Sequence, residues 1–128
     1  MEVIYNSKEK ELKADNKRYM SIDLGVDNLC AVSSNVIKSE LINGKNIKQI
    51  NHNWNKRKAY LQSRLSENQY NSNLITSITN KRNFRIQNYF HKVSKYIVNH
   101  AVSNNINTII IGHTNEWKQE TNIGEVNN

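Results

Sequence analysis

Apolar and polar residues alternate along the first half of the chain in the way that is typical of β-strands. Residues 19–26 (YMSIDLGV) predict a strand with a buried apolar face. Residues 28–33 (NLCAVS) predict the return strand of a hairpin, with its turn near residues 25–28. The two segments together predict an antiparallel pair.

The next break in the pattern is Asn43-Gly44, a dipeptide typical of two-residue β-hairpins. It is flanked by residues 36–41 and 45–50, so we expect a second hairpin that extends the sheet into an antiparallel meander. Before the meander we expect a short strand at residues 2–5 and a charged linker at residues 7–18.

In the second half the pattern changes to the period of a helix. A charged helical segment covers residues 55–68, and a longer helix is predicted over residues 74–103, after a break at residues 71–73. Residues 107–112 form an apolar, β-branched run. We expect a buried strand there, which follows a helix and should therefore run parallel to a strand of the hairpin sheet.

The long helix is predicted to have two distinct faces. At about 100° per residue, its apolar side chains share one face. This face holds Ile86, Tyr89, Phe90, Val93, Ile97 and Ala101, and the opposite face holds Lys81, Arg85, Asn88, Lys92, Lys95 and Asn99. We therefore expect one face to pack on the core and the other to remain in solvent.

The order of elements indicates an α/β fold. An antiparallel meander, two basic helices and a parallel buried strand correspond to the first two-thirds of an RNase H-like (RuvC-like) core. We therefore expect two parts, an N-terminal strand and linker remnant at residues 1–18 and an incomplete core at residues 19–128.

Charge indicates the kind of partner. The 128 residues carry 18 Lys and Arg against 11 Asp and Glu, a formal net charge of +7, and the mean hydropathy of −0.78 is low for an independent domain. Residues 51–100 contain nine basic residues and one acid, Glu67. Such one-sided charge favours nucleic acid, while a basic domain without a polyanionic partner is the alternative. The candidate nucleic-acid-binding residues are Lys81, Arg82, Arg85, Lys92, Lys95, Lys56 and Arg57.

Other residue types exclude several classes of protein. Cys30 is the one cysteine, so an intrachain disulfide and a cysteine zinc cluster are excluded, and zinc is not expected. The chain has no apolar stretch of about 18 residues and no signal-peptide pattern, so we expect no membrane partner and a cytoplasmic location. His52, His91, His100 and His113 lack the spacing of metal ligands.

Asp23 is the candidate catalytic carboxylate. It lies in an otherwise apolar strand, where a buried charge is costly unless it is compensated. Coordination of Mg²⁺ or Mn²⁺ is one compensation, and backbone hydrogen bonds at the turn before Gly25 are the other. Asp27 is interpreted as a turn residue.

A two-metal nuclease needs further carboxylates that converge on metals about 4 Å apart. The end of the predicted buried strand beside Asp23 is the natural place for one, but this strand ends at Gly112. The next acids are Glu116 and Glu120, each of which is either a ligand that reaches back or an exposed loop residue. We take Glu120 as the candidate second catalytic and metal-binding residue.

Several segments resemble the OrfB/TnpB family of transposon-encoded proteins. Residues 20–29 (MSIDLGVDNL), 31–35 and 42–45 resemble the region of its first RuvC motif, and residues 81–94 resemble its basic helix. Residues 109–112, followed by Asn115, Trp117, Lys118, Gln119 and Glu120, resemble one branch of the family. The resemblance covers residues 18–124, with the motifs in the same order and spacing.

The resemblance implies an RNA-guided, metal-dependent DNA endonuclease linked to transposition, with DNA and guide RNA as partners. It implies that Asp23 is the first metal ligand and that the second, usually at the position of Gly112, is displaced to Glu120. The third acidic motif and the zinc ribbon of the family lie beyond residue 128, so we expect this chain to bind nucleic acid without cleaving it alone.

Two other functions are compatible with parts of the sequence. The first is a catalytically inactive module that binds RNA or DNA. The second is a nucleotide-binding fragment similar to actin and sugar kinases, which would need a second glycine-rich phosphate loop. The chain has four glycines and no such loop, so this alternative is disfavoured.

Overall fold

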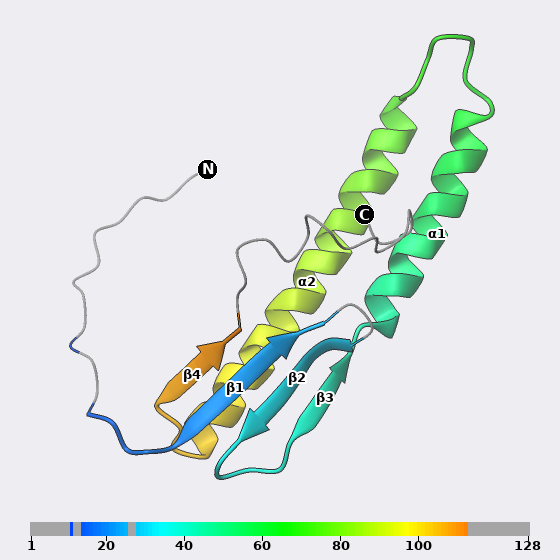
Figure 1. Ribbon diagram of the computed structural model, residues 1–128. Coiled ribbons are helices and arrows are strands. Elements are labelled where there is room, and N and C mark those ends of the chain that lie inside the picture. Colours follow the sequence, from blue (N-terminus) through cyan, green and yellow to red (C-terminus); the bar gives the residue numbers. More distant parts are fainter. Residues whose placement is uncertain (1–10, 12–13, 26–27, 113–128) are drawn as a thin grey trace.

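The computed structural model of the protein describes residue 11 and residues 14–25 and 28–112. Within them the chain forms four strands and two helices (Figure 1). In chain order these are β1 (Tyr19–Leu24), β2 (Asn28–Ser34), β3 (Glu40–Asn43), α1 (Lys45–Gln62), α2 (Asn73–Ser103) and β4 (Thr108–Ile111). The expected strand at residues 2–5 lies outside the described residues.

The strands form one mixed sheet in the order β3-β2-β1-β4. β2 is antiparallel to both β1 and β3, and β4 is parallel to β1. The predicted hairpin of β1 and β2 and the predicted parallel strand after the long helix are therefore confirmed. The fold is mixed α/β, as the sequence indicated.

The core lies between one face of the sheet and the C-terminal half of α2. Met20 and Ile22 of β1 alternate with exposed residues, and both are buried against the helix. The side chains that complete this core are Cys30, Val32, Ile97, Ala101 and Ile106. The prediction of a strand with one apolar face is correct, because alternate side chains of a strand point to opposite faces. Cys30 is a core residue, as predicted, and burial raises the pKa of its thiol.

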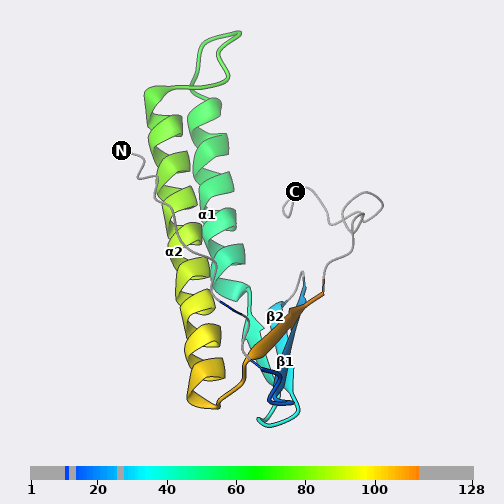
Figure 2. The same cartoon turned by 90° about the vertical axis from the view of Figure 1, so that its left-hand side faces the viewer.

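The two helices form a hairpin that extends beyond the sheet (Figures 1 and 2). α2 begins where Ser72 Oγ accepts a hydrogen bond from the backbone N–H of Ile75, 3.3 Å away. This cap lies at the break predicted for residues 71–73, and the predicted helix over residues 74–103 is confirmed. Among the described residues, neither helix has the combination of length and hydrophobicity that spanning a membrane requires.

The second hairpin predicted around Asn43-Gly44 is wrong. β3 does end at Asn43, but residues 45–50 form the first turns of α1. Gly44 has φ −92° and ψ 4°, whereas the central residues of a type I′ turn need positive φ. The N–H of Lys48 donates to the carbonyl of Gly44 at 3.0 Å, which closes the first helical turn.

The apolar positions of α1 explain this outcome. Ile47, Ile50, Trp54 and Leu61 are spaced as on one helix face, and all four are partly buried. α1 therefore begins ten residues before the predicted start at residue 55 and ends at Gln62 rather than residue 68. The strand predicted over residues 36–41 is limited to β3, which begins at Glu40.

Burial of β4 is not observed in the described structure. Ile109, Ile110 and Ile111 are 38%, 54% and 57% exposed. The described helices lie on one face of the sheet, and β1 pairs with one edge of β4 (Figure 2). A fully apolar strand needs cover on both faces, and these elements provide only part of it.

Candidate nucleic-acid interface and the Asp23 strand end

Asp23 lies on the exposed face of the sheet, near the C-terminal end of β1. Its neighbour on β2 is Ala31. The side chain of Asp23 is exposed, so the expectation of a buried carboxylate that needs compensation is wrong for the described structure. The position keeps the carboxylate accessible at the edge where β1 and β4 both end.

Gly112 directly follows β4, at the position that continues the register beside Asp23. The parallel register pairs Ile22 with Ile111, and the N–H of Gly112 donates to the carbonyl of Ile22 at 3.1 Å. A Cβ built on Gly112 would have that carbonyl oxygen as its nearest neighbour, 4.0 Å away. The strand-tip position next to Asp23 therefore has space for a Cβ but carries no side chain.

The described residues do not by themselves make a metal centre. No group of three or more His, Cys, Asp or Glu that could hold an ion occurs among them. Glu120, the predicted second ligand, lies outside the described residues, as do Glu116, His113 and Asp27. Among the described residues, Asp23 supplies one of the several carboxylates that a two-metal site needs.

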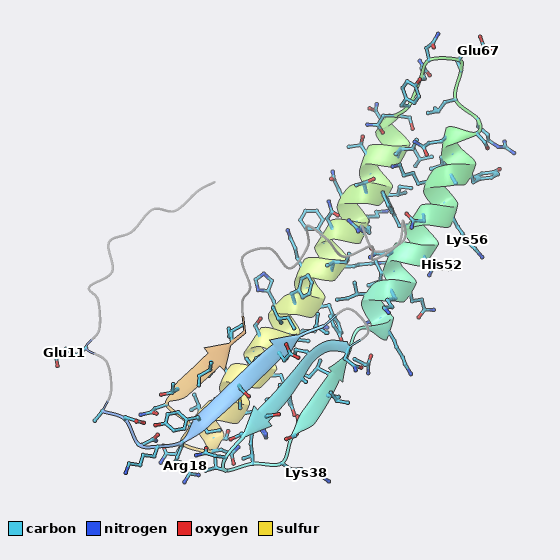
Figure 3. All side chains as sticks on the ribbon, viewed as in Figure 1. Glu11, Arg18, Lys38, His52, Lys56 and Glu67 are labelled. Atoms are coloured by element: carbon cyan, nitrogen blue, oxygen red, sulfur yellow. The ribbon has the colours of Figure 1, made fainter. Side chains whose placement is uncertain are left out.

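The predicted basic residues lie on the helical hairpin. Six of them have exposed side chains, namely Lys56 and Arg57 on α1 and Lys81, Arg85, Lys92 and Lys95 on α2. Glu67, the one acid between residues 51 and 100, lies in the connection between the two helices, at the end of the hairpin farthest from the sheet (Figure 3). The hairpin is thus a cationic surface along its length.

Arg82 differs from the other predicted residues because it is partly buried between the helices. Its Nε donates to Oδ1 of Asn51 at 2.8 Å, and its Nη1 donates to Oδ1 of Asn83 at 2.9 Å. Its guanidinium carbon lies 5.0 Å from the centroid of the Trp54 ring. These three contacts fix the guanidinium, and none of the partners is an anion that would neutralise it.

Trp54 organises this cluster, and sequence reasoning did not identify it. The Nζ of Lys58, one turn further along α1, lies 4.9 Å from the ring centroid. The ring nitrogen Nε1 donates to Oγ1 of Thr79 on α2 at 3.1 Å. The i, i+4 spacing of Trp54 and Lys58 was visible in the sequence, but the contacts with α2 were not.

A second polar cluster joins β3 to α2. The hydroxyl of Tyr96 donates to Oε2 of Glu40 at 2.7 Å, and the Tyr96 ring stacks on His100 with centroids 5.7 Å apart. The Nε2 of His100 lies 3.9 Å from Oε1 of Glu40. The hydrogen bond to Glu40 raises the pKa of the Tyr96 hydroxyl, with smaller contributions from burial and from the charge of Glu40. His52 and His91 are exposed.

The described residues form a mixed α/β fold. They combine a four-stranded sheet, a carboxylate at one strand end and a basic helical hairpin. A family model described as "Probable transposase", OrfB_IS605, matches residues 2–118. The chain belongs to this OrfB/TnpB transposase family, as its motifs indicated.

A relative with a known family name agrees with this assignment. The TnpB-like protein of Methanocaldococcus jannaschii is 25% identical over 101 residues, which cover 75% of this chain. The matched region is 36% of the length of that relative, so the chain spans about a third of it. No solved structure gives a significant match.

Proposed function

We propose that this chain is a nucleic-acid-binding part of a TnpB-like transposase and that the α1–α2 hairpin makes the contact. The observation that carries the proposal is the one-sided charge of residues 51–100, with nine basic residues against Glu67. Like charges that are this dense on one hairpin repel each other, and phosphates relieve that repulsion. Six of the seven candidate side chains are exposed and accessible to a polyanion.

We further propose that the sheet belongs to an RNase H-like core whose intact protein cleaves DNA with a guide RNA. The strand order β3-β2-β1-β4, with β4 parallel to β1, supports this proposal. In this reading Asp23 is one ligand of Mg²⁺ or Mn²⁺, and Glu120 supplies another. The metal would stabilise the attacking and leaving oxygens of a phosphodiester.

A second candidate function is nucleic-acid binding without cleavage. The relationship between Asp23 and Gly112 favours it, because the strand-tip position beside the only carboxylate on this edge of the described sheet has no side chain. In that case the chain binds and positions the nucleic acid, and any cleavage requires carboxylates from elsewhere in the intact protein.

Binding assays on this chain test the first function, and cleavage assays on the intact protein separate a nuclease from a module that only binds. We expect labelled DNA and RNA to bind at low salt, with an affinity that falls steeply as salt rises because bound counterions are released. Absence of binding at low salt, or binding that does not respond to salt, contradicts the first proposal. Any Mn²⁺-dependent cleavage should disappear in Asp23→Ala, and cleavage that survives this change removes Asp23 from the mechanism.

A further inference from the structure

The helical hairpin contains a groove between α1 and α2 that is lined by cations. Its volume is about 240 Å³. The residues that line this α1–α2 groove are Ile50, Asn53, Trp54 and Arg57 of α1 and Ile78, Lys81, Arg82 and Arg85 of α2. Four of the eight are Lys or Arg and none is Asp or Glu, so the charge of the groove favours an anionic group.

Arg82 gives the groove a fixed centre. Its hydrogen bonds to Asn51 and Asn83 and its position over Trp54 hold the guanidinium in place before any ligand arrives. All these partners are uncharged, so the positive charge is oriented by them rather than neutralised. Arginine presents several N–H donors in a planar fork that suits phosphate oxygens, and a fixed fork loses less entropy on binding.

Trp54 supports Arg82 in a way that favours a phosphate over a base as the ligand. The ring already contacts the cationic groups of Lys58 and Arg82, and its N–H is used by Thr79. An aromatic ring that stacks on bases needs an open face, whereas this one carries cations. The groove therefore lacks the features of base recognition and has those of backbone recognition.

We propose that the α1–α2 groove binds a backbone phosphate of a nucleic acid, with Arg82 as the fixed donor and Arg57, Lys81 and Arg85 as the surrounding charges. This proposal rests on the proposed nucleic-acid-binding function and deepens it by naming the site and the moiety. A phosphodiester is common to DNA and RNA, so the groove accepts both and does not read sequence.

The test measures fluorescence anisotropy of the whole chain with labelled single-stranded DNA, RNA of the same sequence and duplex DNA. The test variants are Arg82→Gln and Trp54→Leu. The matched control is Lys95→Gln, which removes the same charge from an exposed position of α2 outside the groove. Circular dichroism of each variant verifies that the helices are intact.

Arg82→Gln is expected to weaken binding about tenfold or more, because a hydrogen bond to a charged group contributes more than an exposed charge. Lys95→Gln is expected to weaken it about threefold, in line with the smaller value of an exposed ion pair. The loss of affinity in Trp54→Leu should lie between these two values, because this change leaves the Arg82 guanidinium in place but removes the aromatic ring that it packs against.

Several results overturn this inference. Equal losses in Arg82→Gln and Lys95→Gln would show that the groove is not the site, while salt-sensitive binding by the parent chain would leave the proposed function intact. Failure of the parent chain to bind at low salt would contradict both the groove as a phosphate site and the proposed nucleic-acid-binding function. A loss confined to DNA or to RNA would show that the groove reads the sugar rather than the phosphate.

Discussion

Asp23 near the end of β1 and Gly112 directly after β4 lie at adjacent positions of the parallel register, although 89 positions separate them in the chain. The pairing of Ile22 with Ile111 and the 3.1 Å hydrogen bond from Gly112 N–H to the Ile22 carbonyl place them side by side. An acid at position 112 would therefore lie next to Asp23, the carboxylate that the described residues place at this strand end. That relationship can be tested by adding the missing side chain.

We predict that Gly112→Glu creates a metal site with Asp23. The nearest atom to a new Cβ is 4.0 Å away, so a Cβ fits without a clash, and a pair of carboxylates binds Mn²⁺ better than one. Titration calorimetry with Mn²⁺ should detect tighter binding than in the parent. Gly112→Gln is the control of equal size, and the gain should vanish when Asp23→Asn is added. A gain that persists without Asp23 would contradict the pairing.

Gly25 should tolerate a methyl group less well than Gly112. A Cβ at Gly25 would lie 3.0 Å from the carbonyl oxygen of Asn28, in the turn where the Gly25 N–H donates to the Leu29 carbonyl at 3.3 Å. Gly25→Ala is expected to lower the free energy of unfolding by about 1 kcal/mol or more, as overpacking does. Urea denaturation of each variant measures this change in the free energy of unfolding. Gly112→Ala is the control and should be neutral or slightly stabilising, and equal effects at both sites would refute this account.

The core between α2 and the sheet should depend on Ile97. Its side chain is 8% exposed and belongs to the cluster with Met20 and Val32. Ile97→Ala should cost about 2–5 kcal/mol of unfolding free energy, the usual range for such a cavity. Val102, on the same helix, is 70% exposed, and Val102→Ala should change stability by about 0.5 kcal/mol or less. Similar losses in both variants would argue against the packing described.

The contact between Tyr96 and Glu40 should make stability depend on pH in the alkaline range. The hydrogen bond to Glu40 favours the protonated phenol, so the pKa of Tyr96 in the folded state lies above its ordinary value of 10.0. Its contribution to stability is full below the unfolded pKa and is lost as the pH rises through the folded pKa.

Tyrosinate absorbance measures this shift, with Tyr96→Phe subtracted to isolate the one phenol. In Glu40→Gln the titration of Tyr96 should move back toward 10.0, because the carboxylate that accepts its hydrogen bond is gone. A midpoint that is the same in both backgrounds would mean that Glu40 does not hold the phenol in solution.

The sequence by itself determined the elements whose pattern is local. The alternation of Met20 and Ile22 with Ser21 and Asp23 predicted β1, and the spacing of Ile97 and Ala101 predicted the buried face of α2. Such periods arise because a strand alternates its side chains and a helix repeats every 3.6 residues, so each can be read without knowledge of the neighbours. The family motifs, which are also contiguous, gave the OrfB/TnpB assignment in the same way.

Tertiary structure decided the features that depend on residues far apart in the chain. Residues 45–50 form a helix because Ile50 and Trp54 line the groove between α1 and α2 and Ile47 is partly buried on the same helix face, although Asn43-Gly44 is locally compatible with a hairpin turn. The exposure of Asp23 follows from helices that cover one face of the sheet. The Trp54–Arg82 contact joins two helices across 28 positions, and only their packing brings a guanidinium onto that ring and fixes it there.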